Sequence, residues 1–254
     1  MNRTIILDSE QFDLFLRCLS NLKEVCNDID IKKGCVRQRT NDKTTIFEMD
    51  LTPIINDIDI SLIELKNKID ILKVFVNQEV SIEINISDEN PDEGEYIISD
   101  SYSSIRITKP TSSFIDNSYI PQEDVSKIYS LQDDEVLMES EITKMISDRI
   151  KTITAAFGST SIQVFFNGDT CDISASNQSR QHTAMFLKDI ILNETMEDSF
   201  ANLTLITFKI DHDDNINFKM YYDEERNITT NTFKTGLGEI EMNMYSNSSV
   251  VEDD

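Results

Sequence analysis

Residues 4–10, Thr-Ile-Ile-Leu-Asp-Ser-Glu, decide the fold because a similar segment returns at residues 135–141, Glu-Val-Leu-Met-Glu-Ser-Glu. In each copy an apolar stretch runs into an acidic-Ser-acidic tripeptide that can cap a following helix. The apolar positions of that helix correspond at the same offset of 131 residues: Leu14, Phe15, Leu19 and Leu22 with Met145, Ile146, Ile150 and Ile153. We therefore predict an internal duplication in which each copy opens with a strand and a helix.

The remaining elements follow from periodicity and turn chemistry. Helices are predicted over 9–25, over 61–76 with a Ser61–Glu64 capping box, and over 139–157. Asn167-Gly168 is typical of a hairpin turn, whereas no second helix is recognisable between 195 and 235. Strands are predicted over 4–7, 45–51, 79–86, 96–98, 104–108, 135–138, 161–166, 171–176, 182–191, 203–210, 216–222, 228–234 and 239–245.

These elements predict an α+β chain built from two similar units, an N-terminal one over 1–108 and a C-terminal one over 135–254. Residues 109–134 interrupt the pattern with prolines, serines and isolated apolar side chains. Flexible linkers rarely contain Phe and Ile, so we expect an ordered connector.

The formal charge of −24 over 254 residues argues against nucleic-acid binding, since phosphate contacts require Lys and Arg. The predicted helices depart from this excess, with net charges of −1 over 9–25, +1 over 61–76 and zero over 139–157. Their basic residues include pairs seven apart, which share a helix face: Lys66 with Lys73, and Lys144 with Lys151. Ordinary solvated helix faces and a surface for an anionic partner both remain open at this point.

The sequence offers few residues in patterns that would support catalysis or metal binding. None of the six glycines makes a phosphate-cradling loop, and with only two histidines, His182 and His212, a catalytic Ser–His or Cys–His pair is not favoured. The four cysteines lack zinc or redox spacing and suit buried thiols. Asp211-His212-Asp213-Asp214 favours a polar hairpin turn over a metal site, and the segment from Asp88 lacks the glycine of a calcium loop. We expect a non-enzyme without cofactor or metal. No signal peptide or membrane span is apparent, so we expect a soluble, intracellular chain, in the host-cell cytoplasm if the source is viral.

Taken together, the tandem strand–helix–strand units and the long connector with isolated apolar residues resemble the trimeric DNA sliding clamps. This family includes proliferating cell nuclear antigen (PCNA) and the clamps of large tailed bacteriophages. The resemblance covers essentially the whole chain and is architectural, without a short motif. The Asn- and Ile-rich, Trp-free composition suits an AT-rich viral genome.

The resemblance implies a homotrimeric ring whose helices line a hole and whose curved antiparallel sheets form the outer wall. Such a ring encircles duplex DNA without reading its sequence, acts as a processivity factor in DNA replication, and has a DNA polymerase and an ATP-dependent clamp loader as partners. It implies DNA-facing roles for the basic helix residues Arg17, Lys23, Lys66, Lys68, Lys73, Lys144, Arg149 and Lys151. It also implies a pocket for partner peptides, formed by Val36, Gln38, Phe114, Ile115, Ile120, Pro121, Met244 and Tyr245.

Other classes of protein remain open. An acidic, duplicated, β-rich chain also suits a viral structural or protein-interaction subunit or a DNA mimic, although a mimic should display carboxylates on its helices. A clamp-like subunit of a transcription or checkpoint assembly would share the fold. The apolar connector residues could equally serve to anchor the connector locally onto the sheet.

Overall fold

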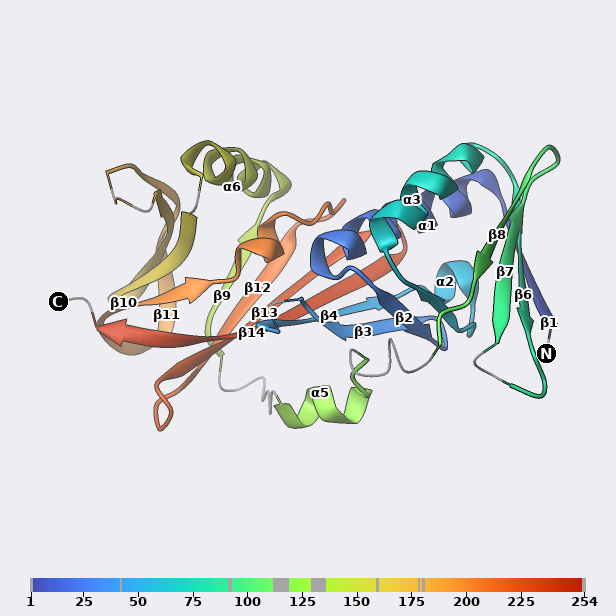
Figure 1. Ribbon diagram of the computed structural model, residues 1–254. Helices are drawn as coiled ribbons and strands as arrows, with labels where there is room; N and C mark the ends of the chain where they lie inside the picture. Colours follow the sequence, from blue (N-terminus) through green and yellow to red (C-terminus); the bar gives the residue numbers. More distant parts are fainter. Residues whose placement is uncertain are drawn as a thin grey trace. The chain divides into compact units, whose positions relative to one another are not determined.

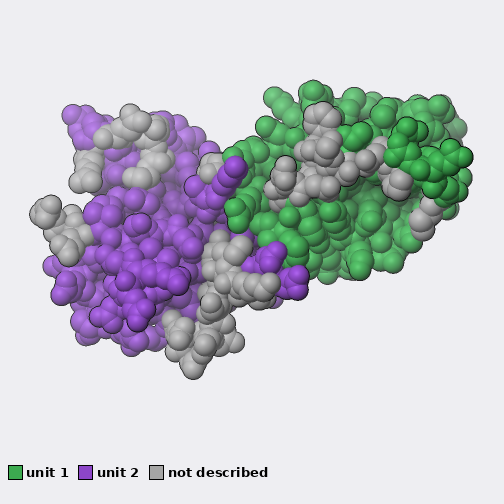
Figure 2. Space-filling model, turned by 60° about the horizontal axis from the view of Figure 1, so that its bottom comes forward, with its two compact units in different colours: residues 1–41, 47–121, 237–240 green, residues 42–46, 122–236, 241–254 purple. Residues whose placement is uncertain are grey.

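The computed structural model describes residues 2–41, 43–90, 93–111, 119–128, 136–158, 160–177, 179 and 181–252. The chain divides into two compact units, which Figure 2 shows in different colours. Unit 1 comprises residues 1–41, 47–121 and 237–240, and unit 2 comprises residues 42–46, 122–236 and 241–254. The main division therefore falls after Pro121, inside the segment predicted as the connector.

Unit 1 combines two antiparallel sheet layers with two principal helices (Figure 1). One sheet has the strand order β1-β6-β7-β8, with Ile82 of β6 opposite Ile5 and Ile84 opposite Tyr96. The other layer has the order β5-β2-β3-β4. The elements of unit 1 are, in chain order, β1 (Asn2–Leu7), α1 (Ser9–Val25), β2 (Ile29–Lys32), β3 (Cys35–Arg39), β4 (Thr45–Asp50), α2 (Thr52–Ile55), β5 (Ile60–Leu62), α3 (Leu65–Leu72), the 3-10 helix η1 (Lys73–Phe75), β6 (Val80–Ile86), β7 (Gly94–Ser99) and β8 (Ser104–Thr108).

The first helix forms where the sequence predicts it. Asp8 accepts a hydrogen bond from the backbone N–H of Gln11 at 2.9 Å, and the Gln11 side chain accepts one from the N–H of Asp8 at 3.2 Å. This reciprocal capping box satisfies two donors that the first turn leaves without helical partners. The apolar stripe of α1 is buried, and the ring of Phe12 meets Phe75 edge-on at 6.3 Å, which joins α1 to the α3–η1 segment.

The predicted start of the second helix is wrong. Ser61 lies in β5, where its hydroxyl donates to Asp30 at 2.7 Å and its N–H donates to the Tyr96 hydroxyl at 2.9 Å. Glu64 precedes the helix in a left-handed conformation, with φ 53°, and makes no side-chain cap. The N–H and hydroxyl of Ser61 are thus engaged by Tyr96 of β7 and Asp30 of β2 instead of in a capping box, and α3 begins at Leu65.

Unit 2 is dominated by strands, with one long helix (Figure 1). Strands β9, β12, β13 and β14 form one layer, in which β9 pairs with β12 and β12 with β13. Strand β11 pairs with β10 along most of its length and with β14 at Ser199–Ala201. The elements are α5 (Gln122–Ile128), β9 (Val136–Ile142), α6 (Lys144–Phe157), β10 (Thr160–Asn177), β11 (Thr183–Leu203), the 3-10 helix η3 (Leu205–Phe208), β12 (Ile216–Asp223), β13 (Ile228–Leu237) and β14 (Ile240–Glu252).

The opening of unit 2 differs from the predicted one. Glu139-Ser140-Glu141 continues β9, which pairs with β12 as far as Ile142 opposite Ile216. The helix cap is Thr143, whose hydroxyl accepts from the N–H of Ile146 at 3.3 Å. The two helix caps, Asp8 and Thr143, are thus 135 residues apart rather than 131. The predicted stripe is wrong in part, because Ser147, Ile150 and Thr154 are buried while Met145 is 58% exposed.

Two further expectations for unit 2 are wrong. Asn167-Gly168 is not a hairpin, because β10 runs through it and pairs with β11 on both sides. Gly168 adopts φ 63° where the pairing register shifts, so its conformational freedom serves a bulge. The strand predicted over 203–210 is replaced by η3, which buries Phe208 and is the one helical segment that the described residues contain between 195 and 235.

Among the residues that the structure describes, no helix is both long and apolar enough to cross a membrane.

Candidate nucleic-acid interface

In unit 1 the basic side chains predicted to face DNA lie on α1 and on the α3–η1 segment, which pack together through Phe12 and Phe75. Arg17 is exposed on α1 and Lys23 is half-buried there. On α3–η1, Lys66 and Lys73 are exposed and Lys68 is half-buried. Because the helix begins after Glu64, its three lysines are opposed by a single carboxylate, that of Asp70. Counted from Leu65 to Phe75, the segment carries a net charge of +2, and Glu64 stands at its N-cap.

Asp70 of α3 forms an ion pair with Lys73 of η1. Its carboxylate accepts a hydrogen bond from Lys73 Nζ at 2.8 Å. This contact and the charge of Lys73 hold the pKa of Asp70 below its ordinary value, and the charges of Lys23 and Lys66 lower that pKa further. Three of the predicted DNA-facing residues thus act on the charge of one carboxylate, and Lys73 contacts it directly. The ion pair is exposed to solvent, so we expect it to stabilise unit 1 only slightly.

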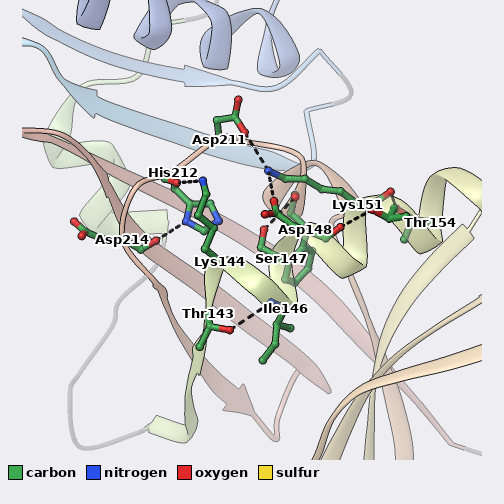
Figure 3. A network of polar contacts seen from close by, with 12 residues as sticks. Thr143, Lys144, Ile146, Ser147, Asp148, Lys151, Thr154, Asp211, His212 and Asp214 are labelled. Atoms are coloured by element: carbon green, nitrogen blue, oxygen red, sulfur yellow. Dashed lines mark hydrogen bonds and ion pairs between the residues drawn. The ribbon is translucent and has the colours of Figure 1, made fainter.

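In unit 2 the basic side chains predicted to face DNA lie on α6, and Figure 3 shows two of them, Lys144 and Lys151. Lys144 Nζ donates to the carbonyl of His212 at 2.6 Å, and Lys151 Nζ lies 3.3 Å from Asp211 and 3.7 Å from Asp148. Arg149 is exposed and makes no ion pair with any residue that the structure describes. Within α6 itself there are three basic residues and one acidic residue, Asp148, because Glu139 and Glu141 belong to β9.

His212 is a buried polar residue beside α6. It is 1% exposed, its Nδ1 contacts the backbone carbonyl of Asp214, and its Nε2 is buried without a hydrogen-bond partner in the described part of the chain. Burial lowers its pKa, the contact with Asp214 opposes this, and the charges of Lys151 and Lys144 add to the lowering. The surrounding segment joins η3 to β12, so it is a polar turn but not the predicted hairpin between two strands.

No group of three or more potential metal ligands lies close together within the described ranges.

The residues predicted for a partner-peptide pocket have varied surroundings. Val36 and Gln38 of β3 are buried, and the Gln38 amide donates to the carbonyl of Asp28 and accepts from the N–H of Asp30, both at 2.9 Å. Ile120 is buried and Pro121 exposed. On β14 of unit 2, Met244 is buried and Tyr245 half-buried; Phe114 and Ile115 lie outside the described residues.

Sequence reasoning missed the group that holds this end of the connector. The N–H of Ile120 donates to the carbonyl of Arg37 at 2.9 Å, and Tyr119 forms a β-bridge with Gln38. The guanidinium of Arg37 donates to the Tyr119 hydroxyl at 3.4 Å, and Lys32 Nζ lies 4.7 Å from the centre of the Tyr119 ring. Arg37 and Tyr119 are 82 positions apart, so no local pattern signals their contact. This end of the connector, at Tyr119 and Ile120, is therefore anchored onto β3.

Comparison with known proteins gives a consistent result. No protein-family model and no curated protein sequence matches the chain. Among solved structures, PCNA from Entamoeba histolytica is 14% identical, with a TM-score of 0.60 over 97% of this chain and 98% of the other. PCNA from Thermococcus kodakaraensis is 10% identical, with a TM-score of 0.61 over 97% and 99%.

Two further similar structures are complexes. One is the PCNA2–PCNA3 complex of Sulfolobus tokodaii, with 14% identity and a TM-score of 0.59 over 98% of this chain and 99% of the other. The second is A. fulgidus PCNA bound to the C-terminal region of FEN-1, with 12% identity and a TM-score of 0.59 over 100% of both chains. The predicted α+β fold of two clamp-type units is confirmed, and this chain has the fold of the PCNA sliding clamps.

Proposed function

We propose that this protein is a DNA sliding clamp, a non-catalytic ring that encircles duplex DNA and tethers a replicative polymerase. The observation that carries the proposal is the placement of positive charge. The chain has a net charge of −24, yet α3–η1 and α6 each carry three basic residues against one carboxylate. In a PCNA-like fold, this is the charge distribution that a protein holding DNA against its helices would need.

Loose phosphate contacts suit this task. Lys and Arg contacts to phosphates supply affinity without reading base sequence, and they let a protein slide along the duplex. The proposed contacts come from Arg17, Lys23, Lys66, Lys68, Lys73, Lys144, Arg149 and Lys151. The acidic remainder of the chain repels DNA from other surfaces, so the duplex is favoured at the helices.

Retention on DNA then depends on closure of a ring. We infer that three copies of this chain assemble into a ring of six units, as the resemblance to trimeric clamps implies. The Sulfolobus tokodaii structure, a complex of two different PCNA chains, supports the inference that chains of this fold associate with one another. A mass measurement in solution at several concentrations tests the trimer.

A partner site at the connector completes the proposal. The A. fulgidus PCNA structure holds the C-terminal region of FEN-1, which supports peptide binding by a chain of this fold. We propose that the polymerase and an ATP-dependent clamp loader bind through short peptides near Ile120 and Pro121. Apolar anchors from such peptides would enter a pocket formed with Val36 of β3 and the neighbouring connector residues.

Topological retention is the decisive test. The protein is loaded onto primed circular DNA with its clamp loader and ATP, and then passed through a sizing column at moderate salt. We expect it to stay on closed circles, to leave circles that are cut once, and to lengthen polymerase products on the closed template. Equal retention on cut and closed circles would contradict the proposal, because electrostatic binding alone needs no closed template.

A further inference from the structure

The segment 211–214, which we call the acidic turn, lies against α6 and contacts its lysines (Figure 3). Asp211 Oδ1 lies 3.3 Å from Lys151 Nζ, and the carbonyl of His212 accepts from Lys144 Nζ at 2.6 Å. Both lysines are predicted to face DNA. Each already has an oxygen partner from the same four-residue segment.

The acidic turn is itself held in place. The N–H of Asp213 donates to the carbonyl of Gly236 at 2.9 Å, and the Thr235 hydroxyl donates to the carbonyl of Asp214 at 3.3 Å. The imidazole of His212 is buried beneath the turn and contacts the carbonyl of Asp214. A carboxylate presented from an anchored segment loses little freedom when it pairs with a lysine, so it competes well with a mobile anion.

The basic residues therefore fall into two classes. Lys66 and Lys68 of α3, like Arg149 of α6, form no ion pair with any residue in the described ranges. Lys151 contacts two carboxylates, and its side chain is only 22% exposed. A DNA phosphate can approach the first class directly, whereas it must displace Asp211 to reach Lys151.

We propose that the acidic turn is an intramolecular competitor for DNA, in which the Asp211 carboxylate takes the place of a phosphate at Lys151. The inference rests on the proposed function and adds a way of regulating it. While Asp211 holds Lys151, α6 contacts DNA mainly through Arg149, and the duplex is held weakly on this side. Release of Lys151 from Asp211 increases the affinity of α6 for DNA. The acidic turn therefore keeps that affinity low enough for the protein to slide along the duplex.

Binding of a short linear duplex at low salt tests the competition. Asp211→Asn removes the carboxylate charge at Lys151, and Asp214→Asn is the matched control because its carboxylate points away from α6 in Figure 3. Exposed ion pairs are worth up to roughly 1 kcal/mol, so we expect D211N to bind about two- to fivefold more tightly than D214N. In a Lys151→Ala background the difference between the two variants should vanish. Equal tightening by D211N and D214N would show a general charge effect and overturn the inference.

A second measurement needs no DNA. Lys151 should react slowly with an amine-directed acylating reagent in the unaltered protein, and D211N should speed that reaction relative to D214N, with Lys66 as an internal reference. If D211N leaves the labelling of Lys151 unchanged, the pair does not hold the amine and the inference fails. If labelling rises but no variant binds duplex, the inference fails, and the proposed function is judged separately by retention on closed circles. If the duplex binds while the two variants stay equal, the inference alone fails.

Discussion

The guanidinium Nε of Arg37 donates to the Glu48 carboxylate at 2.8 Å, and both side chains are largely withdrawn from solvent, at 23% and 11% exposed. The same guanidinium reaches the hydroxyl of Tyr119 at the end of the connector. One side chain therefore neutralises a carboxylate on β4 and holds a residue from a distant part of the chain. Arg37 links the sheet of unit 1 to its connector.

Arg37→Ala should destabilise unit 1 by about 1–3 kcal/mol, because it leaves Glu48 with a poorly solvated charge and no partner. Chemical denaturation measures the free energy of unfolding. The matched control is Arg106→Ala, which breaks an ion pair with Glu95 in which Arg106 is 70% exposed, and it should cost less than about 1 kcal/mol. Equal costs for the two variants would show that burial does not strengthen the Arg37 pair.

The helix caps give a second prediction. Asp8→Ala and Thr143→Ala should each cost about 1 kcal/mol of unfolding free energy, since each removes the acceptor for a backbone N–H in the first helical turn. Ser140→Ala, at the cap position that the sequence pattern suggests, should stay within about 0.5 kcal/mol because Ser140 lies in β9. If S140A loses more unfolding free energy than T143A, α6 begins at residues 139–141 and the prediction is contradicted.

These caps also show why sequence reasoning succeeded in one unit and failed in the other. The N-terminus of α1 depends on local interactions, because Asp8 and Gln11 cap each other within one helical turn. The N-terminus of α6 depends on β12, which pairs with β9 as far as Ile142 and so keeps residues 139–141 in a strand. A cap signal that competes with a distant strand cannot be judged from local sequence.

The same physical distinction applies to the site. Helical spacing predicted that basic residues lie on α3 and α6, and the charges of Lys23, Lys66 and Lys73 all lower the pKa of Asp70. The contacts of Lys144 and Lys151 with the acidic turn join positions 60 or more apart in the chain, and no periodicity encodes them. The turn at Asn167-Gly168 was mistaken for a hairpin because a bulge uses the same glycine conformation.

His212 gives a prediction on pH. Its pKa in the folded protein is lowered from 6.5, chiefly by burial, so the unfolded chain binds a proton before the folded one does. Stability from this residue is therefore present above pH 6.5 and is lost as the pH falls below that value. His212→Asn keeps an amide donor near the Asp214 carbonyl and should weaken the dependence of unfolding free energy on pH between neutral and mildly acidic conditions. Substitution of the exposed His182 by Asn is the control, and an equal change in both variants would contradict the assignment.

Lys66 and Lys68 of α3 give the sharpest test of DNA contact. If each of them contacts a phosphate, the double substitution to alanine should weaken duplex binding alike on unrelated sequences. It should also lower the slope of log affinity against log salt by about one for each phosphate that is no longer neutralised.

The control is Arg226→Ala, which removes an exposed positive charge from the β12–β13 connection, where the side chain pairs with Asp223. We expect R226A to leave the slope unchanged, because binding is proposed to depend on charge at the helices rather than on the net charge of −24. If the slope falls by the same amount per removed charge in both variants, binding depends on net charge and not on the position of the lysines. That result would contradict a role for the helices in DNA contact.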